Sequence, residues 1–370
     1  MTRGWTRHDR VMRALPVDAD RIRAAWLGRI SGCQLGKPVE VLSMLKGKAA
    51  LDAYLEATDD LPLRDYVTLD ADAPGGKLVE GIGKACCRGH QTRAEPDDDI
   101  NYTVLSLLLL ESRGADFDTE DVARMWLQLL PAGMTFTAER AAYRTLLDRG
   151  AEHFAQGAPA GFDLAECSDN EFNDWIGAQI RTDLYGWVSP GRPERAAAMA
   201  RRDAALSHRG EGVHGAVFVA ALGAAIPACD DLEAAIDAAL EHVPAGSGAA
   251  EAVRLGRELA GADDAVARLH AHYDGLSPVH TLNNLAIVVW ALCGAGGDYG
   301  AAVGEAVAAG WDTDCNGATV GGLFGLTGAP IDERWLAPWR GRVGLSLAGE
   351  GEQSLDDLVA RTVEVATRIA

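Results

Sequence analysis

The chain has 370 residues, of which 48% are hydrophobic and 24% are charged, and its net charge at pH 7 is −20. An apolar fraction of this size is enough for a substantial buried core and excludes a disordered chain. The strong negative charge argues against nucleic acid as a partner, because phosphate backbones require a basic surface.

The seven cysteines show no paired spacing that would indicate a disulfide framework. Such scattered thiols, in an odd number, favour a reducing compartment. No basic-then-apolar leader opens the sequence, and no apolar run reaches the ~18 residues that a membrane-spanning helix needs. We therefore expect an unprocessed cytoplasmic protein without a membrane partner.

Small residues recur at every fourth position in two segments: Ala24, Gly28, Gly32 and Gly36, and then Gly317, Gly321 and Gly325. Residues four apart share one face of a helix, and a glycine inside a helix costs roughly 1 kcal/mol relative to alanine. Membrane helix dimers use similar spacing, but neither segment is apolar enough to span a bilayer. We expect instead that these faces let another backbone pack closely around a functional site.

Three adjacent carboxylates, Asp97, Asp98 and Asp99, precede the apolar run Ile100–Leu110. Aspartates are typical of helix caps and first turns, but a helix N-terminus stabilises each charge by only about 0.3–1 kcal/mol. A solvated acidic cap is the simpler interpretation. A charge at the end of a buried helix must be paired or neutralised, however, and hard cations take oxygen ligands from Asp. The cluster therefore indicates a metal site.

Five further segments show helical spacing of apolar residues: Thr119–Leu130, Glu139–Phe154, Pro193–His208, Asp230–His242 and Ala249–His272. Short pieces with Gly or Pro separate them, and alternating β-branched strands are nearly absent. We find no long linker and no internal repeat. The sequence predicts one all-α domain over residues 1–370, with a motif-bearing core at about residues 20–330.

The segment 183–191 is expected to join two helices, and it contains Asp183, Tyr185 and Trp187. Aromatic faces suit a sugar or a base, and Asp183 offers a hydrogen-bond acceptor. The segment is therefore a candidate for substrate binding, and a structural turn between helices is the alternative.

Three more polar residues are candidates for substrate binding at helix ends. His208 ends a predicted helix, where it serves either a ligand or the helix dipole. His280 and Asn283 open an apolar helix and are expected to face the same cleft.

A second acidic pair, Asp312 and Asp314, lies in the string Gly310–Gly321 and is followed by Cys315. Both carboxylates lie where a helix is expected to begin, so both can meet one ion. The glycines that follow admit a neighbouring helix.

Three segments, in this order, resemble the motifs of the ADP-ribosylglycohydrolase superfamily: Gly32–Glu40, Asp97–Ile100 and Asp312–Cys315. That family has an early Gly-Asp-x-Leu-Gly stretch with a downstream Glu, a Thr/Ser-Asp-Asp-Thr stretch and a late Asp-x-Asp-Thr stretch. Order and spacing match from about residue 20 to the C-terminus.

The resemblance implies a compact, orthogonal multi-helix bundle with two divalent ions, Mg²⁺ or Mn²⁺, in a cleft. The metal ligands that it implies are Asp97, Asp98, Asp99, Asp312, Asp314 and Cys315. It implies catalytic roles for Glu40, Asp98 and Asp312, and Asn101 joins the expected substrate-binding residues. The implied reaction is hydrolysis of an N- or O-glycosidic bond at C1 of a ribose.

The chain departs from the family pattern at three positions. Cys33 replaces the usual Asp of the first motif, and Ile100 replaces a Thr. Cys315 stands where a Thr hydroxyl normally binds metal, and a thiol is a soft ligand that suits magnesium poorly. Cys315 is a spectator, a weak ligand or a nucleophile.

These departures leave three functions open. The first is hydrolysis of a ribosyl or ADP-ribosyl substrate, either a small molecule or a group attached to a protein. The second is hydrolysis of a nucleoside or another small N-glycoside. The third is non-catalytic binding of ADP-ribose or a nucleotide.

Overall fold

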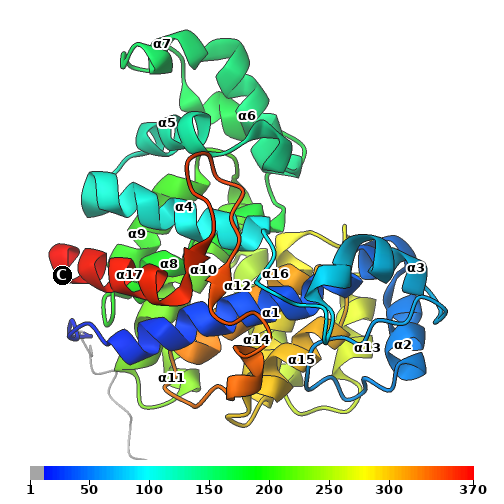
Figure 1. Ribbon diagram of the computed structural model, residues 1–370. Coiled ribbons are helices and arrows are strands. Elements are labelled where there is room, and N and C mark those ends of the chain that lie inside the picture. Colours follow the sequence, from blue (N-terminus) through cyan, green and yellow to red (C-terminus); the bar gives the residue numbers. More distant parts are fainter. Residues whose placement is uncertain (1–11) are drawn as a thin grey trace, which may run out of the picture.

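The computed structural model describes residues 12–370, which fold into helices with one short ladder (Figure 1). In that ladder, β1 (Arg342–Val343) pairs antiparallel with β2 (Gln353–Ser354). The predicted all-α class is confirmed.

The helices of the described chain are α1 (Ala19–Lys46), α2 (Lys48–Ala57), α3 (Gly76–Leu78), α4 (Asp98–Arg113), α5 (Thr119–Leu129), α6 (Thr137–Arg149), α7 (Ala151–Ala155), α8 (Asp183–Trp187), α9 (Pro193–Ala204), α10 (Gly210–Ala225), α11 (Leu232–Leu240), α12 (Gly248–Leu259), α13 (Ala265–His272), α14 (Thr281–Gly294), α15 (Tyr299–Ala308), α16 (Thr313–Gly325) and α17 (Leu355–Ile369). Short 3₁₀ and π turns join several of them.

The longest helix, α1, runs across the middle of the molecule, and α16 packs along it (Figure 1). A Cβ added to Gly28 would lie 2.1 Å from the carbonyl oxygen of Gly321. On Gly36 it would lie 2.3 Å from the carbonyl oxygen of Thr313. The expected close approach of two backbones is confirmed, because only residues without a side chain fit between these helices.

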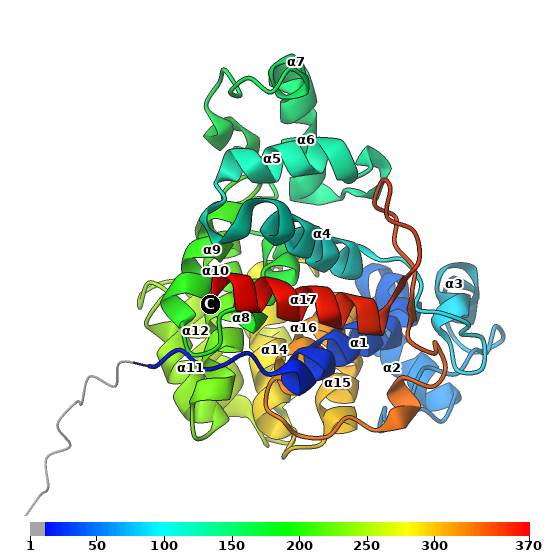
Figure 2. The ribbon, with the colours of Figure 1, turned by 60° about the vertical axis from the view of Figure 1, so that its left-hand side comes forward.

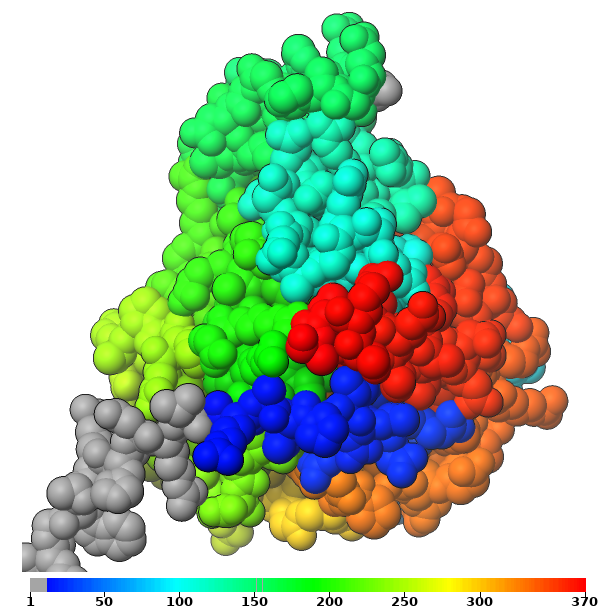
Figure 3. Space-filling view, turned by 90° about the vertical axis from the view of Figure 1, so that its left-hand side faces the viewer, coloured from blue at the N-terminus to red at the C-terminus, as the bar shows by residue number. Residues whose placement is uncertain are grey.

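The C-terminal helix α17 covers the other side of α1 and also contacts α4 (Figure 2). The indole N–H of Trp26 on α1 donates a hydrogen bond to the hydroxyl of Thr362 on α17, at 2.9 Å. On the face in Figure 3, α17 (red) lies beside the beginning of α1 (blue). The end of the chain therefore helps to fix the helix that carries the first motif.

From the sequence we expected no apolar run long enough to span a membrane, but one helix is an exception. Gly210–Ala228, which is α10 with the turn after it, meets the length and composition of a membrane span. In the structure 72% of its most apolar window is buried among other helices. This burial is typical of a central core helix that is apolar on every side.

Three expected elements differ in the structure. The segment Ala249–His272 is not one helix but two, because Gly261 adopts a left-handed φ of +79° between α12 and α13. The segment Glu139–Phe154 is likewise divided, with Gly150 between α6 and α7. The expected loop 183–191 begins with a helical turn, α8, so its side chains are set by helix packing.

Candidate metal centre

The first acidic cluster caps and opens α4, as the sequence predicted. Asp97 is the N-cap residue with extended backbone, and its Oδ1 accepts the N–H of Asp99 at 3.0 Å. Asp98 and Asp99 form the first turn. Asp99 is fully buried, and its Oδ2 has no hydrogen-bond partner among the described residues. A buried carboxylate oxygen without a partner is costly, so this atom is suited to bind a cation.

The second acidic cluster opens α16. Asp312 precedes the helix and Asp314 lies in its first turn, where its Oδ1 accepts the N–H of Cys315 at 3.0 Å. The hydroxyl of Thr313 donates to the carbonyl oxygen of Gly36 on α1 at 2.8 Å. This hydrogen bond fixes the start of α16 against the glycine face of α1.

The two clusters meet in space although they are more than two hundred residues apart. Three groups have potential ligand atoms within 4.8 Å of one another: Cys33 with Asp97 and Asp99, Asp99 with Asp314 and Cys315, and Glu40 with Asp312 and Asp314. Asp99 and Asp314 are each shared by two groups. Because the backbones of α1 and α16 touch, Cys33 and Glu40 on α1 come close to the acidic residues at the starts of α4 and α16.

Burial dominates the electrostatics of the centre. It raises the pKa of Asp98, Asp99 and Asp312 well above the usual range, and neighbouring carboxylates raise each pKa further. Burial and the charges of Asp314 and Asp312 likewise raise the pKa of Glu40. The carboxylates therefore repel one another strongly without an added cation.

Asp97 is the exception. Burial by itself would raise its pKa, but the ammonium of Lys37 forms an ion pair with its Oδ2, and the pKa of Asp97 is lowered. A second basic residue, Arg29, is buried and binds Asp99 Oδ1 at 3.1 Å and Asp183 Oδ2 at 3.0 Å. We did not identify Lys37 or Arg29 from the sequence. The available signal was a basic side chain within a glycine-rich, buried stretch of α1.

The donor set fits a divalent cation. Most of the potential ligand atoms in each of the three groups are carboxylate oxygens, which Mg²⁺ and Mn²⁺ prefer. One of these oxygens, Asp99 Oδ2, has no hydrogen-bond partner among the described residues. The thiols of Cys33 and Cys315 lie within the same groups, and burial raises the pKa of both well above the ordinary value. Sulfur thus contributes two of the candidate ligand atoms.

Helix α8 holds its predicted substrate-binding residues in the core. Asp183 pairs with Arg29, and the hydroxyl of Tyr185 donates to Asp203 Oδ2 at 2.6 Å. Trp187 packs its ring against that of Trp26, with centroids 5.2 Å apart. These contacts favour structural roles, and contact of the three side chains with substrate stays a prediction.

The predicted histidines lie in different surroundings. His208 is buried beyond the end of α9, with Nδ1 hydrogen-bonded to the Ser207 hydroxyl at 2.8 Å and Nε2 3.8 Å from Glu139 Oε1. His280 caps α14, and its Nδ1 accepts the N–H of Leu282 at 3.2 Å. The Nδ1 atom of each imidazole therefore has a structural partner, whereas the buried Nε2 of His208 has no hydrogen bond within the described chain.

The predicted asparagines each keep one polar atom without a hydrogen bond. Asn101 accepts the N–H of Ser346 at 2.9 Å, while its Nδ2 is buried and without a partner among residues 12–370. Asn283 donates to the carbonyl oxygen of Ser277 at 3.2 Å, and its buried Oδ1 has no partner in the same part of the chain. Contact of either side chain with substrate stays a prediction.

The neighbour of Asn283 contacts the second cluster directly. Asn284 Oδ1 accepts the backbone N–H of Asp312 at 3.3 Å and the amide of Asn316 at 2.8 Å. Its own amide donates to the carbonyl oxygen of His280 at 2.8 Å. Asn284 therefore ties the start of α14 to the start of α16. The sequence did not distinguish it from Asn283.

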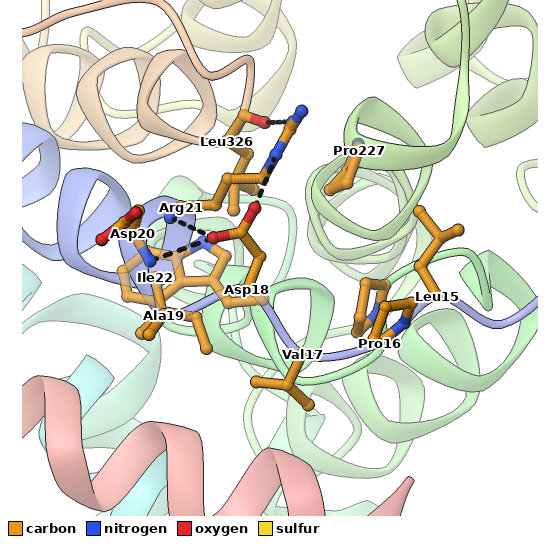
Figure 4. A pocket seen from close by; sticks show the side chains of 12 residues that line it. Leu15, Pro16, Val17, Asp18, Ala19, Asp20, Arg21, Ile22, Pro227 and Leu326 are labelled. Atoms are coloured by element: carbon orange, nitrogen blue, oxygen red, sulfur yellow. Dashed lines mark hydrogen bonds and ion pairs between the residues drawn. The ribbon is translucent and has the colours of Figure 1, made fainter.

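A cavity of about 460 Å³ lies at the other end of α1 (Figure 4). Asp18, Arg21 and Trp187 are among its lining residues, and Asp18 caps α1 by accepting the N–H of Asp20 at 3.0 Å. At about 1.5 Å per helical residue, Asp18 lies roughly 28 Å from Lys37. The cavity is therefore remote from the acidic clusters.

Comparisons with known proteins agree with the fold and the clusters. A family model described as ADP-ribosylglycohydrolase matches residues 14–368. Among solved structures, the chain is similar to an "ADP-ribosylglycohydrolase-related protein complex", with a TM-score of 0.50 and 20% identity over 95% of this chain and 99% of that chain. No match was found among curated proteins. Since the family match extends over almost the whole chain, the protein belongs to the ADP-ribosylglycohydrolase family and is a hydrolase of that type.

Proposed function

We propose that the protein hydrolyses an N- or O-glycosidic bond at C1 of a ribosyl group, and that two divalent ions, Mg²⁺ or Mn²⁺, assist the reaction. The observation that carries this proposal is the convergence of Asp99, Asp312, Asp314 and Glu40 in overlapping groups of potential ligand atoms. The unpartnered Oδ2 of the buried Asp99 supports it. A cation would offset both the repulsion and the unsatisfied oxygen.

Asp98, Asp99, Asp312 and Asp314 would hold the ions. The family resemblance also implies Asp97 and Cys315 as ligands, but both oxygens of Asp97 already accept from Lys37 and Asp99. When bound, such ions supply charge stabilisation and a more acidic water. Glu40 and Asp98 are half-buried, whereas Asp99, Asp312 and Asp314 are buried. This partial exposure supports the proposal that Glu40 and Asp98 are the carboxylates next to the substrate. We assign to Glu40 the role of general base or of a charge that stabilises an oxocarbenium-like transition state.

The family and the charge of the chain support the proposed substrate class. A ribosyl or ADP-ribosyl group, free or attached to a protein, offers vicinal hydroxyls that suit an oxygen-rich metal centre. The net charge of −20 argues against nucleic acid. All seven cysteines lie within the described residues and are in the reduced form, which supports the proposed cytoplasmic location.

A second candidate function rests on Cys33, Ile100 and Cys315. Buried Ile100 has no hydroxyl, and the two thiols replace oxygen ligands at the centre. These changes favour a related substrate, such as a nucleoside or another small N-glycoside. The third function left open by the sequence, non-catalytic binding of ADP-ribose or a nucleotide, is disfavoured by the family match, and binding without any reaction product would restore it.

The test is Asp312→Ala with Asp72→Ala, an exposed aspartate outside the clusters, as the control. Asp312→Ala should lose both bound Mn²⁺ and hydrolysis with unchanged helical circular dichroism, and Asp72→Ala should keep all three. Thermal shift with ADP-ribose, ribose and nucleosides, in Mg²⁺ or Mn²⁺, identifies ligands. Product analysis then separates the enzyme candidates from the sensor. Turnover that persists in chelator-treated protein contradicts the metal-assisted reaction.

A further inference from the structure

Lys37 occupies an unusual place at the acidic centre. It follows Gly36 on α1, its side chain is 20% exposed, and its ammonium forms an ion pair with Oδ2 of Asp97. The Asp97 side chain is only 2% exposed, and its Oδ1 accepts the N–H of Asp99 at 3.0 Å. Both oxygens of Asp97 are therefore bound to donors of this chain.

The other carboxylates of the centre are different. Asp99 Oδ1 accepts a hydrogen bond from Arg29, but Asp99 Oδ2 has no partner among the residues that the structure describes. Between residues 12 and 370, the Lys and Arg ion pairs of the two clusters involve Asp97 and Asp99 alone. Within the described chain, no Lys or Arg forms an ion pair with Asp312, Asp314 or Glu40, and Lys37 acts on Asp314 only as a more distant charge that opposes the rise of its pKa on burial. The carboxylate oxygens that still lack a cationic partner therefore belong to Asp99, Asp312, Asp314 and Glu40, and not to Asp97.

We propose that Lys37 is a resident cation of the centre, which makes Asp97 the cap of α4 and not an ion ligand. Divalent ions then bind on the side of Asp99, Asp312, Asp314 and Glu40. The inference rests on the proposed function only in assuming that this centre binds ions.

The charge of Lys37 explains why Asp97 does not need a metal ion. An ammonium beside a carboxylate makes the pair neutral, and the ammonium repels a divalent ion that approaches the same carboxylate. Cys33, Asp97 and Asp99 have ligand atoms within 4.8 Å of one another, so they would otherwise form a further ion position. The Lys37 ammonium occupies Asp97 Oδ2 and repels a divalent ion from the group of Cys33, Asp97 and Asp99, so no ion binds next to the Cys33 thiol.

This arrangement predicts the effect of removing the ammonium. Lys37→Met should bind one more ion per chain than the wild type, and with Cd²⁺ it should gain thiolate-to-metal absorbance. Lys37→Met/Cys33→Ser should lack the added absorbance. Lys37→Arg keeps the charge and should keep the wild-type ion number. Equilibrium dialysis with Mn²⁺ followed by elemental analysis measures the ion number.

Lys37→Met/Asp97→Asn tests the same inference even where Lys37→Met alone does not fold, because it removes the ion pair as a whole and Asn also caps helices well. The double variant leaves this position neutral, as the Lys37–Asp97 pair does, so no uncompensated ammonium repels the ions. The proposal predicts that the double variant keeps the ion number of the wild type and loses less than tenfold in Mn²⁺ affinity, whereas Asp99→Asn loses at least tenfold. A tenfold or larger loss in the double variant overturns the proposal, and so does a folded Lys37→Met with the wild-type ion number. Wild-type protein that binds no Mn²⁺ contradicts the proposed function itself, which is a different outcome from ion loss confined to the double variant.

Discussion

Gly32 of α1 and Gly317 of α16 meet backbone to backbone. A Cβ on Gly32 would lie 2.0 Å from the carbonyl oxygen of Gly317, and a Cβ on Gly317 would lie 2.4 Å from that of Gly32. Since α16 begins with the second acidic cluster, this contact also sets where that cluster lies relative to α1 and α4.

Gly32→Ala should therefore damage stability and the centre together. Overpacking a rigid contact typically costs about 1–3 kcal/mol, and a displaced α16 should bind Mn²⁺ more weakly. Gly81→Ala is the matched control, because a Cβ there meets nothing within 4 Å. Urea unfolding and calorimetric Mn²⁺ titration measure both effects. Equal stability and affinity in the two variants would show that the close contact is unimportant.

Asn284→Ala should be much more harmful than Asn283→Ala. Loss of the Asn284 side chain leaves the buried N–H of Asp312 and the amide of Asn316 without an acceptor, at a cost of about 1–3 kcal/mol each. Asn283 makes one side-chain hydrogen bond, to Ser277. We expect the Asn284 variant to lose ion affinity as well, and thermal unfolding with Mn²⁺ titration compares the pair. If Asn283 contacts substrate, its variant should mainly raise KM.

Arg29→Met should destabilise the fold severely. It leaves Asp99 and Asp183 buried without their shared guanidinium, and breaking a buried pair in this way costs about 3–5 kcal/mol. On the same helix, Arg23→Met removes an exposed ion pair with Asp356, which is worth about 0–1 kcal/mol. Denaturant unfolding of both variants checks the contrast. Similar losses in the two would contradict the assigned role of Arg29.

Cys315→Ser should reveal whether this sulfur binds an ion. The Sγ lies in the group with Asp99 and Asp314, so Cd²⁺ should produce thiolate-to-metal absorbance in the wild type that disappears in the variant. Cys293→Ser is the control, because Cys293 contacts Glu233 outside the clusters. Absorbance that survives in Cys315→Ser would make Cys315 a spectator.

His208 should make the protein less stable in mild acid. Burial first, and then the charge of Arg181, hold its pKa well below the usual range, so the folded imidazole stays neutral while the unfolded one gains a proton near pH 6.5. The unfolded state thus binds more protons below that pH, and the free energy of unfolding falls as pH falls.

Between pH 7.5 and 5.5 this loss should be on the order of 1 kcal/mol. The other charged groups of the network are Glu139, 3.8 Å from the imidazole, and Asp203, which binds Arg181. Because burial raises the pKa of Glu139, its contribution to the pH dependence has the opposite sign. The difference between wild type and His208→Asn in urea unfolding isolates His208. Identical pH dependence in both proteins would rule out its contribution.

The sequence predicted correctly those features that depend only on residues within one short segment. Helix caps depend on a few adjacent residues, so Asp97 and Asp312 were correctly placed at the starts of helices. The glycines at every fourth residue also predicted that another backbone packs closely against each helix, and the structure shows that α1 and α16 are each other's partner. The prediction that segment 183–191 is a loop was wrong in its first turn, which is helical. This turn packs against α10 and α4, and such packing cannot be read from the segment's own sequence.

The sequence by itself determined the all-α class, the helix starts at the two acidic clusters and the motifs of the family, since caps and periodicity are properties of neighbouring residues. Tertiary structure decided which charges meet: Lys37 with Asp97, and Arg29 with both Asp99 and Asp183. It also selected Asn284 over Asn283 as the support of Asp312. A pairing between distant residues depends on the rotation and crossing of whole helices, and no short stretch of sequence specifies those quantities.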